Sequence, residues 1–167
     1  ASARLIRNVF DTAKEANLRM MASPPLDSYT RLVMYATEWF MGKAAGVVAV
    51  ILLDDKNRTV HTEALSSSHT IRAASYARTL TSLADTHSVC RLVLMHNHAN
   101  GIMKPSDEDL YLTEQLYNTL REKNITILEH LIVHKFECVP ILDKALHKRA
   151  SGFPLALTSD EAALLLE

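Results

Sequence analysis

Residues 89–98, VCRLVLMHNH, are an apolar run that ends in two histidines, and residues 105–110, PSDEDL, follow after a short gap. The run is short and bounded by polar residues, which predicts a buried strand. Ser106 precedes an acidic segment with leucines at helical spacing, which predicts the start of a helix. The sequence therefore predicts a strand, a loop and a helix that bring His96 and His98 close to one helix N-terminus.

The rest of the chain alternates between helical and strand patterns. By apolar spacing we expect helices at 3–21, 28–40, 70–84 and 106–122, and strands at 46–53, 59–65, 89–95, 125–133 and 137–141. The first two strands form a hairpin, and Ser159, Asp160 and Glu161 could cap a last short helix. This order predicts an α/β (α+β) fold in which one mixed central sheet is flanked by helices, with an extra N-terminal helix.

Composition limits the class of protein. The chain has 167 residues, of which 48% are hydrophobic, enough for one domain with a core. Its 18 basic and 19 acidic residues give a net charge of −1, which does not support DNA as a partner. We find neither a run of about 18 apolar residues nor a signal peptide, and we expect no membrane association. Cys90 and Cys138 lie in apolar runs, where we expect buried, reduced thiols and hence a cytoplasmic location.

The two histidines and the helix start that follows them predict a metal site. Residues i and i+2 of a strand point to the same side, so His96 and His98 can converge. Asp109 falls in the first turn of the predicted helix, where negative charge is favoured. Three such ligands and a water make up a catalytic zinc site, and we expect one Zn²⁺ per chain. Ser106 and Asp109 also fit a simple capping box, but a cap does not account for the histidine pair.

Two further side chains are candidates for roles near this site. Glu63 lies two residues after His61 on one strand face, and an acid beside a metal site can transfer a proton to a leaving amine. The alternative is an exposed strand glutamate with no such role. His130 lies within the predicted strand at 125–133, where we expect a group of the core or one that supports a ligand.

Together these residues resemble the JAMM motif of the JAB/MPN-domain metalloproteases. The matching positions are Glu63, His96, His98, Ser106 and Asp109. The similarity is closest to the RadC-type branch, which also has Asn-Arg before the glutamate strand, as at positions 57–58. Ala99 and Asn100 depart from the Pro-Ser that this branch carries after the second histidine. The resemblance divides the chain into an N-terminal helical extension (1–24), a JAB/MPN domain (25–145) and a C-terminal tail with a short helix (146–167).

The resemblance implies a role for each matching residue. His96, His98 and Asp109 would hold Zn²⁺, Glu63 would act as the general base, and Ser106 would support the oxyanion. The implied activity is zinc-dependent hydrolysis of a peptide or isopeptide bond by a zinc-activated water. The expected partner is a protein or peptide substrate, with a ubiquitin-like tail as one candidate, and a homodimer is a further expectation. The alternative is a DNA-associated, RadC-like module without peptidase turnover.

Overall fold

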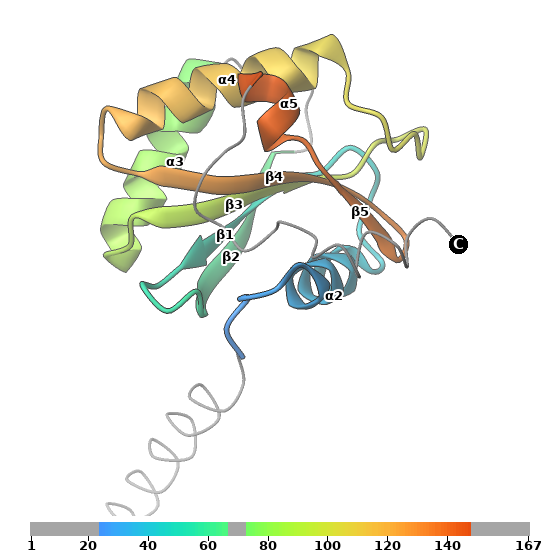
Figure 1. Ribbon diagram of the computed structural model, residues 1–167, viewed down its shortest axis with the longest axis horizontal. Helices are drawn as coiled ribbons and strands as arrows, with labels where there is room; N and C mark the ends of the chain where they lie inside the picture. The colour runs from blue at the N-terminus through green and yellow to red at the C-terminus, as the bar shows by residue number, and fades with distance from the viewer. Residues whose placement is uncertain (1–23, 67–72, 148–167) are drawn as a thin grey trace, which may run out of the picture.

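A computed structural model of the chain describes residues 24–66 and 73–147 (Figure 1). The helices expected at 3–21 and near the C-terminus lie outside these residues. The described elements are α2 (Tyr29–Phe40), β1 (Val48–Leu53), β2 (Thr59–Ser66), α3 (Ala73–His87), β3 (Arg91–His96), α4 (Asp107–Arg121), β4 (Thr126–His134), β5 (Glu137–Pro140) and α5 (Leu142–Leu146).

The five strands form one mixed sheet in the order β2-β1-β3-β4-β5. Strand β1 pairs antiparallel with β2 and with β3, β3 runs parallel to β4, and β4 pairs antiparallel with β5. Helix α2 covers one face, while α3, α4 and the short α5 lie over the other (Figure 1). The predicted mixed sheet with flanking helices is confirmed.

Two apolar cores lie on the two faces of this sheet. Ile51 and Met95 point to the core under α2, whereas Leu52 and Leu94 point to the core under α3 and α4. Because β1 and β3 are central strands covered on both faces, their sequences are continuous apolar runs rather than alternating ones. By the same alternation, His96 at the end of β3 falls on the α4 face.

Besides shifts of one or two residues at strand ends, the structure departs from the sequence predictions in three features. Helix α3 extends to His87, three residues beyond the predicted end. Cys90, expected to be buried, is exposed just before β3, while Cys138 is buried as expected. Helix α5 was not predicted; its first N–H, on Leu142, donates to the side chain of Glu129 at 2.9 Å, a contact across 13 residues of sequence. A five-residue helix depends on such tertiary contacts, because so short a helix has little stability of its own.

The longest helices in the described ranges, α3 and α4, have 15 residues each, and neither they nor the shorter ones are long and apolar enough to cross a bilayer.

Candidate metal centre

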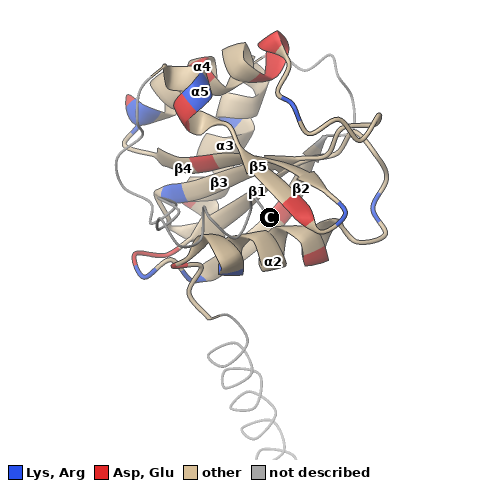
Figure 2. Cartoon of the chain, turned by 45° about the vertical axis from the view of Figure 1, so that its right-hand side comes forward, with Lys and Arg blue, Asp and Glu red and all other residues tan. Residues whose placement is uncertain are grey.

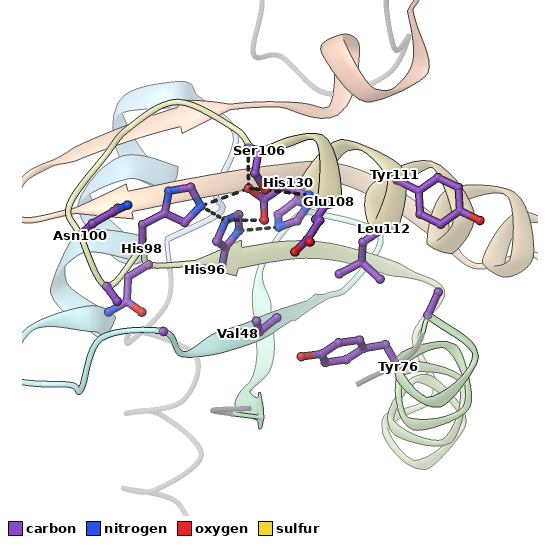
Figure 3. A pocket seen from close by; sticks show the side chains of 15 residues that line it. Val48, Tyr76, His96, His98, Asn100, Ser106, Glu108, Tyr111, Leu112 and His130 are labelled. Atoms are coloured by element: carbon purple, nitrogen blue, oxygen red, sulfur yellow. Dashed lines mark hydrogen bonds and ion pairs between the residues drawn. The ribbon is translucent and has the colours of Figure 1, made fainter. Parts of the chain in front are cut away.

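Three potential ligand atoms meet where β3 ends beside the start of α4 (Figure 3). His96 Nε2 lies 2.8 Å from His98 Nε2 and 3.3 Å from Asp109 Oδ1, and His98 Nε2 lies 3.2 Å from Asp109 Oδ2. The structure therefore brings together the two histidines and the carboxylate that the sequence singled out.

These separations fit a tetrahedral ion. With metal–ligand bonds of about 2.0–2.1 Å, the ligand atoms of tetrahedral zinc lie about 3.3 Å apart. The tautomer of His98 fits as well: its Nδ1 lies 2.6 Å from the carbonyl oxygen of Ile102, which can only accept a hydrogen bond. The ring hydrogen of neutral His98 is therefore on Nδ1, and the lone pair of Nε2 faces the site.

Asn97 holds the chain between the two histidines. Its Oδ1 accepts a hydrogen bond from the backbone N–H of Val47 at 2.7 Å, and its Nδ2 donates to the carbonyl of Ala44 at 2.9 Å. Its backbone also pairs with Gly46 and Val47. These contacts tie the end of β3 to the segment before β1 and fix the direction in which His98 leaves the strand. This role of Asn97 was not predicted, and the only sequence signal for it is its position inside the histidine pair.

The loop after His98 returns to support that histidine. Gly101 has φ +68°, and a Cβ at this position would lie 2.8 Å from Cε1 of His134. The side chain of Asn100 accepts a hydrogen bond from the N–H of Ile102 at 3.0 Å, within the turn that presents the Ile102 carbonyl. Glycine is thus required both for the backbone conformation and for the close approach to His134.

Ser106 and Asp109 form the capping box of α4, and Asp109 is also one of the candidate metal ligands. Ser106 Oγ accepts from the N–H of Asp109 at 3.1 Å, and the hydroxyl and N–H of Ser106 both donate to Asp109 Oδ2, at 2.6 and 2.8 Å. Burial would raise the pKa of Asp109, but its contact with His96 and the hydrogen bonds from Ser106 outweigh the burial and hold the pKa well below its usual range. The carboxylate is therefore ionised and available as a ligand.

His130, on β4, lies behind His96. Its Nε2 is 2.9 Å from His96 Nδ1, and its Nδ1 is 2.6 Å from the hydroxyl of Thr113 on α4. Burial, and then the proximity of His96, lower the pKa of His130 well below its ordinary value. The prediction that His130 is a core group or supports a ligand is confirmed. Thr113 was missed, because helical spacing identified only the leucines of α4 as buried.

Glu63 lies apart from this cluster. It is on β2 opposite Val50, on the same sheet face as His96, but β2 is two strands and about 10 Å from β3. Its exposed carboxylate accepts a hydrogen bond from His61 Nε2 at 3.1 Å. Glu63 is not among the residues that line the cavity at the metal centre.

The candidate ligands border a cavity of about 550 Å³ between β1, α3 and α4 (Figure 3). Val48, Tyr76 and Leu112 form an apolar wall, and the carboxylate of Glu108 lies at the side of α4. Basic and acidic residues are interspersed over the part of the chain that the structure describes (Figure 2). The first turn of α4, which lies beside the site, is acidic. The cavity thus combines a metal-ligand set with an apolar wall and a carboxylate.

Comparison with known proteins identifies relatives of the chain. A family model described as "RadC-like JAB domain" matches residues 26–151, about three quarters of the chain. A UPF0758 protein of Nitrosomonas europaea is 28% identical over 142 residues, covering 84% of this chain and 63% of the relative. One of Alcanivorax borkumensis is 30% identical over 126 residues (72% and 56%), and one of Shewanella denitrificans is 32% identical over 98 residues (59% and 44%). The chain spans about half the length of the curated relatives that it matches.

Proposed function

Because the chain belongs to the RadC-like JAB domain family, as its resemblance to the RadC branch indicated, we propose that it is a zinc-dependent metallopeptidase of the JAMM type. Its reaction is the hydrolysis of a peptide or isopeptide bond in a protein or peptide substrate. The observation that carries this proposal is the convergence of His96, His98 and Asp109 at one edge of a cavity large enough for a substrate side chain.

Each residue of the site has a role in this reaction. His96, His98 and Asp109 would hold the zinc, which when bound supplies Lewis acidity toward a water and a carbonyl oxygen. Ser106 Oγ donates its hydrogen to Asp109 Oδ2 at 2.6 Å and so keeps the carboxylate in place; to support a developing oxyanion, as the motif implies, the hydroxyl would turn from Asp109 toward the substrate. The apolar wall of Val48, Tyr76 and Leu112 excludes water from one side of the cavity.

Glu63 is the proposed proton carrier. In this role its carboxylate would accept a proton from the attacking water and deliver it to the leaving amine, which requires the Glu63 side chain to reach the metal centre from β2. Support for this role comes from the motif and from its position on the sheet face that carries His96. The competing carboxylate is that of Glu108, which lines the cavity directly. These two residues therefore form a natural pair for comparison.

The experiment measures metal content and hydrolysis in matched variants. Protein purified without chelator should contain about one zinc per chain. The probes are a fluorescence-quenched peptide library and a branched peptide with an isopeptide-linked lysine. Glu63→Gln should abolish cleavage while retaining zinc, and Glu108→Gln should retain both. If only Glu108→Gln loses cleavage, Glu108 and not Glu63 is the general base. If cleavage persists both in Glu63→Gln and after zinc is removed with a chelator, the proposal is refuted.

The described surface favours a peptide over a nucleic acid as the substrate. Asp107 and Glu108 place negative charge in the first turn of α4 beside the cavity, which Glu108 lines, and this charge would repel a phosphate backbone. Salt-dependent binding of duplex DNA at physiological ionic strength would instead favour the DNA-associated alternative. The cytoplasmic location and the homodimer stay predictions.

A further inference from the structure

Three buried polar side chains form a line from α4 through β4 to β3. Thr113, His130 and His96 are 0%, 3% and 6% exposed. The Thr113 hydroxyl lies 2.6 Å from His130 Nδ1, and His130 Nε2 lies 2.9 Å from His96 Nδ1 (Figure 3 shows the two rings side by side). The line ends at His96 Nδ1, and the other ring nitrogen, Nε2, is the candidate ligand atom.

The direction of these hydrogen bonds follows from the Thr113 end. The Thr113 hydroxyl donates to the backbone carbonyl of Asp109 at 2.6 Å, and a carbonyl oxygen can only accept. The single hydroxyl hydrogen is used there, so Thr113 accepts from Nδ1–H of His130. A buried, neutral imidazole has one ring hydrogen, and His130 Nε2 is therefore an acceptor.

His96 must then carry its hydrogen on Nδ1 to satisfy His130, which leaves the lone pair of His96 Nε2 directed at the site. In the other tautomer, His96 Nε2–H could donate to His98 Nε2, only 2.8 Å away, and the two ligands would satisfy each other instead of a metal. The Ile102 carbonyl fixes His98 independently. Separate hydrogen bonds therefore fix the tautomers of His96 and His98.

We propose that Thr113 and His130 are positioning residues that hold His96 in its metal-binding tautomer. This inference rests on the metal site of the proposed function and not on hydrolysis. Thr113 also holds the backbone carbonyl of Asp109, so one chain of hydrogen bonds connects two of the three ligands. Hydrogen-bond partners of this kind are worth about 10–100-fold in metal affinity.

The first test reads the tautomers directly. Long-range ¹⁵N–¹H correlation spectra of the metal-free protein near pH 8.5, well above the ordinary imidazole pKa of about 6.5, distinguish Nδ1–H from Nε2–H. We expect the hydrogen on Nδ1 in both His96 and His130. A hydrogen on Nε2 of His96 would overturn the proposal. This measurement is independent of zinc binding and of turnover.

The second test compares two substitutions of one residue. Thr113→Val removes the hydroxyl with little change in shape, and Thr113→Ser keeps it. In competition with a chromophoric chelator, we expect Thr113→Val to bind zinc about 10–100-fold more weakly than wild type and Thr113→Ser to stay within about threefold. The spectrum of Thr113→Val should also show His96 partly as the Nε2–H tautomer. Equal affinities of the two variants would overturn the proposal.

A third variant tests the same hydrogen bonds in case Thr113→Val does not fold. His130→Phe replaces the ring with one of similar shape that has no acceptor, and it should weaken zinc binding by a similar factor. Unchanged zinc affinity of folded His130→Phe would also overturn the proposal. Tight zinc binding by wild type without cleavage of any probe would count against the proposed function alone.

Discussion

Replacement of Glu129 by Gln should change how the stability of the protein depends on pH. Glu129 is 6% exposed, and its Oε1 accepts hydrogen bonds from the N–H groups of His130 and Leu142 at 2.8 and 2.9 Å. Burial raises the pKa of this carboxyl to about 7, the two N–H groups lower it in part, and the nearby Asp143 raises it again. Glutamine can keep an oxygen at the position of Oε1 but does not ionise.

The size of the effect follows from the difference between the folded and unfolded pKa. In the unfolded chain Glu129 has its ordinary pKa of 4.5. Between pH 4.5 and about 7 the folded state keeps a proton that the unfolded state has lost, so wild-type stability falls as the pH rises. At about 1.4 kcal/mol per pH unit, the loss over this window is about 3 kcal/mol. The stabilising contribution is fully present below pH 4.5 and gone above the folded pKa.

Urea denaturation of wild type and Glu129→Gln between about pH 4 and pH 8.5 measures this difference, with chelator present so that metal binding does not contribute. We expect the free energy of unfolding of the variant, relative to wild type, to rise by about 3 kcal/mol across the range. Glu137→Gln is the control, because it removes the same charge from an exposed position on β5. A change of less than about 1 kcal/mol, or one matched by the control, would refute the reasoning.

Four further substitutions test the candidate metal centre and its supports. Asp109→Asn removes the charged ligand and should leave less than about a tenth of a zinc per chain by metal analysis; retention of a full equivalent would exclude Asp109 as a ligand. Gly101→Ala should cost about 1–2 kcal/mol in urea denaturation because of its positive φ. His134→Ala in the same protein should recover only the part due to the 2.8 Å contact, and a neutral Gly101→Ala would contradict the assigned backbone. Asn97→Ala leaves the N–H of Val47 without its acceptor and should cost about 1–3 kcal/mol by the same measurement, whereas a loss below about 0.5 kcal/mol would show that the contact is not needed.

Most elements of the described fold could be predicted because their signals are local. The apolar runs of β1 and β3 and the leucine spacing of α4 gave these elements to within a few residues. The same local patterns predicted that His96, His98 and Asp109 lie close together. Strand alternation sets the side of the sheet to which the histidines point, and the Ser106 cap sets the position of Asp109 in the first turn of α4.

The sequence by itself determined the candidate ligand set, the order of most elements and the family resemblance. The tertiary structure decided what supports the ligands: the contact from Leu142 to Glu129 that starts α5, the contact of Thr113 with His130, and that of His130 with His96. These contacts join residues 13, 17 and 34 positions apart, whereas helical and strand periodicities describe neighbours within about four residues. The tertiary structure also placed Glu63 two strands away from His96, because the order of strands in a sheet is set by packing of the whole chain and not by the pattern within any one strand.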